Sequence, residues 1–329
     1  MRTDLNDIDR KLLNIIQAEF PLNREPFLAL GMRLNISGEE VLRRIERLKA
    51  EGIIRQIGPV CNAQKLGYQT TLVGMRVPVE QLSNAAQVIG AHPGISHGYE
   101  RDNDFNFWFT LAMPNREDIG NEVQKLATKI EAKATINLPA VRVFKIGFYL
   151  DIAGDNWTTP DTSSNCATIS YKDSDLSPND RAIVNELQQD LPLIERPFDL
   201  TSARLSMDVS DLLNRCQSLM RCGIIRRFGA SLRHTSLGFT ANVMACWKVP
   251  PVMVETTGKK IAALREVSHC YERKTSPLWP YNLFAMIHAS KKQTCQDRVD
   301  KLSQETELGE YILLFSTREF KKVRVRYLV

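Results

Sequence analysis

The chain of 329 residues contains the same pattern twice. The segment EFPLNREPF at residues 19–27 aligns with DLPLIERPF at residues 190–198, a shift of 171 residues. The segment GIIRQIGPVCNAQKLGY at residues 52–68 aligns with GIIRRFGASLRHTSLGF at residues 223–239 at the same shift. A constant shift indicates one structural unit used twice. The shift grows to 176 residues near the C-terminus, because the second copy inserts SPLWP in a loop.

The first half of each copy has the pattern of three helices and a strand. In the first copy, a second short helix is expected over residues 26–34. The third helix is predicted to begin with a capping box of Ser37 and Glu40 and to end at Gly52, a residue that favours the left-handed conformation beyond a helix. The alternating segment IIRQIGPV follows as a wing strand. In the second copy, Ser177 is predicted to cap the first helix, with Pro178 as its first residue, and Asp208 is predicted to open the third.

The second half of each copy alternates in the order strand, helix, strand, strand, helix, strand, which is typical of a ferredoxin-like unit. The predicted fold class is therefore α+β: a tandem duplication of a winged helix-turn-helix and a ferredoxin-like unit. The two ferredoxin-like units are expected to pack through their sheets as an internal dimer. The predicted segments are winged helices at 1–62 and 174–233, ferredoxin-like units at 63–150 and 234–329, and a polar linker at 151–173.

Composition sets broad limits on the function. The chain has 43% hydrophobic residues and no apolar run of membrane-spanning length, so a cytoplasmic protein without a membrane partner is expected. Its seven cysteines are odd in number and scattered, which favours reduced thiols over disulfides or a zinc site. The net charge of +5 is too small to indicate nucleic-acid binding by itself, and it is compatible with a local basic pocket for an anionic small molecule.

Two strands share the pattern Ser-His-x-Tyr-Glu-Arg. Because side chains alternate along a strand, the imidazole, phenol and guanidinium of each strand are predicted to lie on one face. Apolar residues would fill a core better, so these polar rows indicate a binding or catalytic site. A solvated face with cross-strand pairs, or a helix covering one hydrogen-bonded histidine, is the structural alternative. The rows are His97, Tyr99 and Arg101 in the first copy and His269, Tyr271 and Arg273 in the second.

The remaining histidines are assigned no function. His288 follows the apolar run LFAMI and is predicted to be structural, and His92 and His234 are predicted to lie in loops.

The order of elements resembles the Lrp/AsnC family of transcriptional regulators. The His-Tyr-Arg strand, followed by an aromatic strand such as FNFWFTL, is more closely similar to siroheme decarboxylases, whose members commonly work as two related subunits. The resemblance implies loss of carbon dioxide from the acetates at C12 and C18 of siroheme, giving 12,18-didecarboxysiroheme for haem d-type or alternative haem biosynthesis.

The resemblance also implies roles for individual residues. His97 or His269 would donate the proton to the nascent methyl carbon, or would ligate the siroheme iron, and Tyr99 or Tyr271 would orient the imidazole or relay the proton. Because siroheme carries eight carboxylates, cations are expected around it. The candidates are Arg101, Arg142 and Lys145, with Arg273, Arg318 and Lys321 in the second copy; Trp108 and Trp279 are candidates to flank the macrocycle, within two aromatic segments that also include Phe105, Phe107, Phe109, Tyr281 and Phe284.

No separate cofactor is expected for this reaction. Electrons left by the departing carbon dioxide can delocalise into the conjugated macrocycle, so neither pyridoxal nor thiamine is required. The protein is predicted to hold no metal of its own, since the iron belongs to the substrate. The two copies diverge after the arginine, and which copy would do the chemistry stays open.

A ligand-responsive regulator that binds DNA is the alternative function. The third helix of the first copy, residues 37–51, has four basic and four acidic residues, and residues 208–222 have two of each. A helix without net charge gains little from phosphate neutralisation, so DNA binding is not expected. The alternative stays open because Arg226, Arg227 and Arg233 make the second wing basic.

Overall fold

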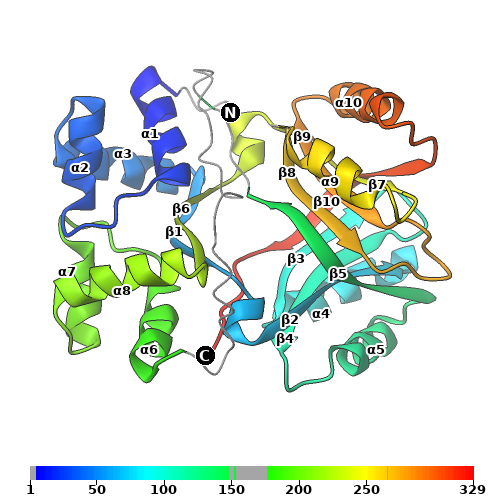
Figure 1. Cartoon of the computed structure of the whole chain (residues 1–329), viewed down its shortest axis with the longest axis horizontal. Helices are drawn as coiled ribbons and strands as arrows, with labels where there is room; N and C mark the ends of the chain where they lie inside the picture. Colours follow the sequence, from blue (N-terminus) through cyan, green and yellow to red (C-terminus); the bar gives the residue numbers. More distant parts are fainter. Residues whose placement is uncertain (1–4, 148–151, 153–175, 265) are drawn as a thin grey trace. The chain divides into compact units, whose positions relative to one another are not determined.

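The computed structural model describes residues 5–147, 152, 176–264 and 266–329, which form two compact units (Figure 1). The helical unit comprises the described residues within 1–67, 149–238 and 327–329. The barrel unit comprises those within 68–148 and 239–326. Each unit thus combines corresponding halves of the two copies. The predicted linker, apart from residue 152, lies outside the described residues.

The helical unit contains three helices from each copy, as the sequence predicts. They are α1 (Asp7–Ala18), α2 (Pro26–Leu34) and α3 (Gly38–Ala50), with α6 (Pro178–Leu187), α7 (Pro197–Arg204) and α8 (Val209–Arg221). The predicted N-caps are confirmed: the side chains of Ser37, Ser177 and Asp208 each accept a backbone N–H of the first turn. Gly52 has the predicted left-handed conformation, with φ at 70°.

The capping box predicted at Ser37 is incomplete. The backbone N–H of Glu40 donates to Ser37 at 3.1 Å, but the Glu40 carboxylate accepts hydrogen bonds from Arg43 and Arg44. Two charge-assisted bonds to arginine are stronger than one to a backbone N–H, which explains the orientation of the glutamate.

The two wing strands form a single ribbon. Strand β1 (Ile54–Cys61) pairs antiparallel with β6 (Ile225–Leu232), and Gly58 lies opposite Gly229. These glycines are equivalent positions of the two copies, so the ribbon has an internal pseudo-two-fold axis at that pair. A Cβ at Gly229 would lie 2.5 Å from the carbonyl oxygen of Ile16, so only glycine fits there. The wing predicted for each copy is thus one strand of a shared pair.

The barrel unit contains the predicted strand, helix, strand, strand, helix, strand order in both copies. The first copy provides β2 (Tyr68–Arg76), α4 (Leu82–Ala91), β3 (Ile95–Arg101), β4 (Phe107–Pro114), α5 (Ile119–Ile130) and β5 (Ala134–Ile146). The second provides β7 (Ala241–Trp247), α9 (Val254–Ala262), β8 (Val267–Arg273), β9 (Leu283–Ala289), α10 (Lys292–Glu305) and β10 (Tyr311–Lys322). Short 3₁₀ turns occur at Gln64–Leu66, Val79–Gln81 and His234–Leu237.

Eight strands close into one barrel in the order β10-β3-β4-β2-β5-β8-β9-β7 (Figure 1). Every neighbouring pair is antiparallel. The copies are joined at two seams, β3 with β10 and β5 with β8, and equivalent residues pair at both. The expected internal dimer is therefore joined edge to edge by hydrogen bonds, which leaves no free strand edge between the copies.

Side chains alternate between the outside and the inside of the barrel. Helices α4 and α5 cover the first copy's strands, and α9 and α10 cover the second's (Figure 1). Phe107 and Phe109 belong to the apolar cluster under the helices, whereas Trp108 belongs to the cluster inside the barrel. The inner cluster combines residues of both copies, so the barrel interior is built jointly.

The described residues bear on two predictions from composition. None of their helices has the length and apolar character needed to cross a membrane. Cys216, Cys246, Cys270 and Cys295 are buried free thiols. Burial raises the pKa of the Cys270 thiol to about 12, so it packs as a small apolar side chain.

Candidate active site

The predicted rows of imidazole, phenol and guanidinium are confirmed in both copies. The rings of His97 and Tyr99 are stacked, with centroids 6.4 Å apart, and the Arg101 guanidinium lies 5.4 Å from the Tyr99 ring centroid. In the second copy the corresponding distances are 6.1 Å and 4.7 Å. Tyr99 pairs with Trp108 on the next strand, and Trp108 belongs to the inner cluster. Both rows therefore face the barrel interior.

The two rows lie on opposite walls of the barrel. Strands β3 and β8 are separated by three strands on either side, so they are diametrically opposed. Because all neighbours are antiparallel, strands four places apart run in the same direction. The two histidines therefore lie toward one end of the barrel, here called the histidine end, and the two arginines lie farther from that end. Sequence spacing could not reveal this opposition.

Neither arginine has a carboxylate partner in the described residues; Arg101 is buried, and Arg273 is half-buried with its Nε shielded from solvent. The Arg101 side chain is 4% exposed, and its Nη1 donates to the Leu314 carbonyl at 2.7 Å. Arg273 Nη1 donates to the Leu138 carbonyl at 2.9 Å. The Nε of each has no hydrogen-bond partner among the described residues. Burial lowers the pKa of each arginine to about 10. The interior thus carries two uncompensated positive charges.

Both arginines act electrostatically on the same buried thiol. Burial raises the pKa of Cys246, while the positive charges of Arg101 and Arg273 both act to lower it. The Cys246 thiol on β7 therefore lies within the electrostatic field of guanidinium groups from both copies.

Positive charge also surrounds the histidine end. Lys322, at the end of β10, pairs in register with His97 and contributes to the electrostatic field at His269. Burial, followed by repulsion from Lys322, Arg273 and Lys145, lowers the pKa of His269 to about 4. His269 is therefore a neutral imidazole at pH 7, and a polyanion bound nearby would raise its pKa.

Each histidine is held by the serine that precedes it. Ser96 Oγ lies 2.7 Å from His97 Nδ1, and Ser268 Oγ lies 2.8 Å from His269 Nδ1. In the second copy the chain of contacts continues, because Ser268 Oγ also lies 2.8 Å from His288 Nε2. His288 Nδ1 is hydrogen-bonded in turn to Asn242 Oδ1.

The connection between His288 and His269 was missed by sequence reasoning. The apolar run before His288 indicated a structural residue, yet its imidazole contacts the serine that holds His269. The signal available in the sequence was the strand pairing of the ferredoxin-like unit, which places the end of its third strand beside the start of its second. The other two histidines lie near loops as predicted: His92 ends α4, and residue 234 begins a 3₁₀ turn.

The predicted ligands Lys145 and Lys321 bind helix ends. Lys321 Nζ donates to the carbonyls of Ile89, Gly90 and His92 at 2.7 to 3.0 Å, at the C-terminus of α4. Lys145 Nζ donates to the Leu264 carbonyl at 2.7 Å, just beyond α9. Each lysine thus caps the other copy's helix. Burial lowers the pKa of both. A role in binding carboxylates stays a prediction.

The predicted ligands Arg142 and Arg318 are exposed and lie outside the two rows. Arg142 forms ion pairs with Glu255 at 3.1 Å and Glu272 at 3.5 Å. The Arg318 guanidinium lies over the ring of Phe320, 4.9 Å from its centroid. The structure therefore brings only one predicted cation from each copy, Arg101 and Arg273, into the barrel interior with the histidines and tyrosines.

The predicted aromatic residues Trp108 and Trp279 pack against each other. Their ring centroids are 5.1 Å apart, and the side chains are 1% and 3% exposed. Trp279 comes from the insertion in the second copy and also contacts Phe105. The insertion thus fills part of the barrel interior that the arginine side chains border. Stacking of either indole on a macrocycle stays a prediction.

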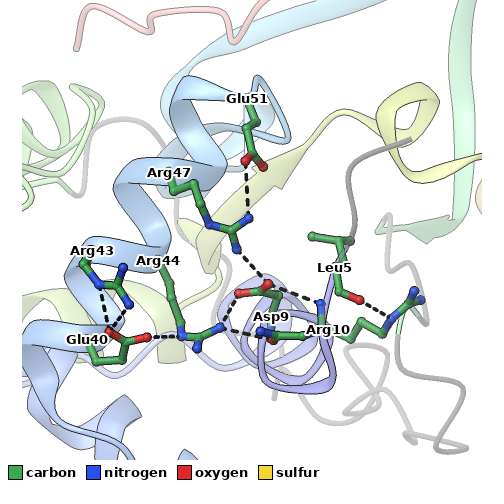
Figure 2. A network of polar contacts seen from close by, with 9 residues as sticks. Leu5, Asp9, Arg10, Glu40, Arg43, Arg44, Arg47 and Glu51 are labelled. Atoms are coloured by element: carbon green, nitrogen blue, oxygen red, sulfur yellow. Dashed lines mark hydrogen bonds and ion pairs between the residues drawn. The ribbon is translucent and has the colours of Figure 1, made fainter. Parts of the chain in front are cut away.

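The arginines of α3 are paired with carboxylates inside the helical unit. Figure 2 shows Arg44 and Arg47 converging on Asp9, each at 2.7 Å, while Arg43 and Arg44 bind Glu40. Asp9 is only 1% exposed. In the second copy, Arg215 pairs with Asp180 at 3.1 Å, and Arg227 of the basic wing donates to the Gln17 carbonyl. These pairs reduce the charge available to phosphates.

Comparison with known proteins agrees with the fold and the two rows. Residues 65–145 and 236–321 match the AsnC-like ligand binding domain, and residues 9–55 and 180–226 match the siroheme decarboxylase NirDL-like HTH domain. A siroheme decarboxylase of Hydrogenobacter thermophilus is 39% identical over 98% of this chain and 95% of its own.

Solved structures show the same relationship. The crystal structure of the siroheme decarboxylase NirDL has a TM-score of 0.72 and 36% identity, covering 98% of this chain and 95% of that chain. A second structure of NirDL, in co-complex with an iron-uroporphyrin III analogue, has a TM-score of 0.71 and 35% identity with the same coverage. This chain, with its duplicated AsnC-like architecture and paired His-Tyr-Arg strands, belongs to the siroheme decarboxylase family.

Proposed function

We propose that this chain is a carboxy-lyase that removes carbon dioxide from the C12 and C18 acetates of siroheme, giving 12,18-didecarboxysiroheme. In each step the bond between the acetate methylene and its carboxylate breaks. The electron pair stays on the methylene carbon, conjugated with the macrocycle, and one proton converts that carbon to a methyl group. The reaction consumes one proton and releases one carbon dioxide for each acetate, with no oxidant or reductant.

One observation supports this proposal most directly: two opposed rows place two carboxylate-free guanidinium groups, from buried Arg101 and half-buried Arg273, and two histidines around one interior. A buried charge without a partner is costly, so its persistence indicates a ligand that supplies the opposite charge. Carboxylates of a tetrapyrrole meet that requirement, and arginine can bind a carboxylate with two parallel hydrogen bonds. Arg101 and Arg273 are therefore proposed to bind carboxylates that remain on the product.

The departing carboxylate needs a different environment. An enzyme that stabilised its negative charge would oppose its loss, so it should lie away from the guanidinium groups. The imidazole and phenol ends of the rows lie farther from the guanidinium groups, and the positive charge there comes mainly from Lys322. Tyr99 and Tyr271 lie between the arginine and the histidine of each row, where a phenol can orient the acetate beside the proton donor.

The proton donor is proposed to be a histidine that becomes protonated when substrate binds. The pKa of His269 is about 4 in the protein alone, because of burial and repulsion by neighbouring cations. Carboxylates of bound siroheme would neutralise those cations and raise the pKa, so the imidazole would take up a proton when substrate is present. Charging of the donor is thereby linked to binding of the substrate.

The test is anaerobic incubation of the purified protein with siroheme, followed by mass spectrometry of the tetrapyrrole. Loss of two carbon dioxide units is expected, with a one-unit intermediate at early times. His269→Gln and Arg273→Met are expected to slow product formation, whereas Lys301→Met, an exposed residue on α10, should not. Unchanged siroheme in the presence of correctly folded protein would refute the proposed activity.

DNA binding receives no support from a specific observation. The α3 arginines are paired with Asp9, Glu40 and Glu51. We expect no salt-sensitive shift of duplex DNA in an electrophoretic assay at 50 to 200 mM salt. A shift whose affinity falls steeply over that range, about a thousandfold or more, would instead favour the regulator.

A further inference from the structure

We propose that Asn242, His288 and Ser268 act as positioning residues that hold the proton of neutral His269 on Nδ1, so that Nε2 is the nitrogen that exchanges a proton with substrate. The inference rests on the proposed decarboxylation and adds to it a hydrogen-bonded chain found on one side of the barrel. It assigns a functional role to His288.

The donor and acceptor roles along this series of hydrogen bonds follow from the residue at its end, Asn242. Asn242 Oδ1 can only accept a hydrogen bond, so the His288 Nδ1 that contacts it must carry the proton. In neutral His288 this leaves Nε2 as an acceptor. Ser268 Oγ lies 2.8 Å from His288 Nε2 and 3.4 Å from the Met286 carbonyl, so it donates its single hydroxyl proton to the nearer imidazole nitrogen. The Ser268 oxygen is left to accept from His269 Nδ1 at 2.8 Å.

The resulting tautomer suits a proton donor. Protonated His269 carries protons on both nitrogens, and the chain retains the one on Nδ1. The proton transferred to the methylene carbon therefore leaves from Nε2, and the donor returns directly to the tautomer that the chain favours. No rearrangement of hydrogen bonds is needed within a catalytic cycle, and solvent supplies the next proton to Nε2.

The hydrogen-bonded series from Asn242 to His269 belongs to the second copy. Asn242 and His288 pair across β7 and β9, and the corresponding pair across β2 and β4 is Thr70 and Ala112. Ala112 has no side chain that can form a hydrogen bond, so the contact between Ser96 and His97 is not extended in the same way. The proposal therefore makes the two histidines inequivalent, although their rows are closely similar.

The chain is also protected from water. Ser268 is 3% exposed, and His288 and Asn242 are half-buried on neighbouring strands. Hydrogen bonds at such sites are stronger than in water and cost more to break. A fixed tautomer is therefore expected to persist in solution rather than to average with its alternative.

The test combines imidazole ¹⁵N NMR with kinetics, both on the full-length protein. In wild type at pH 7.5, His269, identified by its absence from His269→Gln, should show a protonated Nδ1 and an unprotonated Nε2. In Ser268→Ala and Asn242→Ala the proton should redistribute toward Nε2. The kcat for siroheme should fall about 10- to 100-fold in both variants, with KM changed less than about threefold, because positioning and not binding is lost.

Thr70→Ala is the matched control, because it alters the position in the first copy that corresponds to Asn242. It should leave the His269 tautomer and kcat unchanged. Ser268→Ala and Asn242→Ala remove few atoms, and the melting temperatures of these variants verify that they fold. A wild-type His269 protonated at Nε2, or Ser268→Ala with unchanged tautomer and kcat, would overturn the proposal. If His269 of the wild-type protein carries its proton on Nδ1 but the protein leaves siroheme unchanged, the decarboxylation is refuted and the hydrogen-bonded series stands.

Discussion

Arg101 and Arg273 project from opposite walls of one barrel, and the same buried thiol, that of Cys246, senses both guanidinium groups. Neither arginine pairs with a carboxylate in the described part of the chain. The fold thus maintains two positive charges in the barrel interior that no carboxylate of the described residues pairs with. Removing either charge should therefore change stability and ligand affinity in opposite directions.

Arg101→Met should stabilise the fold and weaken binding. The lowered pKa of Arg101 corresponds to a penalty of about 3 kcal/mol on its charged form, partly offset by the bond to Leu314. We expect the free energy of unfolding to rise by about 1 to 3 kcal/mol. The Kd for iron-uroporphyrin III, measured from its absorption spectrum, should rise about 10- to 100-fold as a charge-assisted contact is lost.

Arg142→Met is the comparison for this experiment, because Arg142 was also predicted to bind carboxylates but is exposed and paired with Glu255. Its free energy of unfolding should change by no more than about 0.5 kcal/mol. A stability loss in Arg101→Met would show that the guanidinium stabilises the fold, and an equal loss of affinity in both variants would show that it has no special role in binding.

His269 should make stability depend on pH in a defined window. Its pKa is about 4 in the folded protein and near 6.5 when unfolded, so the unfolded chain binds the extra proton between these values. Stability from the neutral imidazole is present above pH 6.5 and is lost as pH falls toward 4. The loss should reach about 2 to 4 kcal/mol, and His269→Gln should lack it.

Urea unfolding of wild type and His269→Gln from pH 7.5 to 4.5 measures this contribution as a difference between the two proteins. Parallel curves for the two proteins would mean that the imidazole is not shielded as the structure indicates. Saturating iron-uroporphyrin III should make the wild-type loss smaller, because bound carboxylates raise the pKa of the folded imidazole toward the unfolded value.

Lys321→Met should affect stability and leave binding intact. The ammonium group donates to three carbonyls at the end of α4, where a cation is favoured by both hydrogen bonding and the helix dipole. The free energy of unfolding should fall by about 1 to 2 kcal/mol, while the Kd for iron-uroporphyrin III changes less than about threefold. A tenfold or greater loss of affinity with unchanged stability would support the role in carboxylate binding predicted from sequence.

Asp9→Asn should strongly destabilise the helical unit. The carboxylate is buried and binds both Arg44 and Arg47, so the amide would leave each guanidinium with only its more exposed partner, Glu40 or Glu51 (Figure 2). A loss of about 3 to 5 kcal/mol is expected in urea unfolding. Glu51→Gln, which removes only an exposed partner of Arg47, should cost about 0.5 kcal/mol or less. Similar values for the two variants would contradict the structural role of Asp9.

Much of the local structure could be predicted from the sequence. The bounds of α2, the caps at Ser177 and Asp208, and the alternation that puts His97, Tyr99 and Arg101 on one face depend on residues only a few positions apart. The capping box at Ser37 was wrong in part because arginines one helical turn away competed for the Glu40 carboxylate. Local rules succeed where no distant group competes.

The assignment of ligands was less predictable, because a residue type does not specify its partner. Lys145, Lys321, Arg142 and Arg318 were grouped with Arg101 and Arg273 as cations, but the structure places them on helix ends or at the surface. His288 was set aside for its apolar neighbours along the chain, whereas its partner Ser268 lies on the adjacent strand.

The sequence by itself determined that the chain is a duplication, which elements each copy forms, and which side chains share a strand face. Those properties follow from turns, caps and a two-residue alternation, all of which act within a copy. Only the tertiary structure decided that the copies share one ribbon and one closed barrel, with His97 opposite His269 and Arg101 opposite Arg273. That arrangement depends on hydrogen bonds between strands more than 100 residues apart, whose pairing no local spacing records.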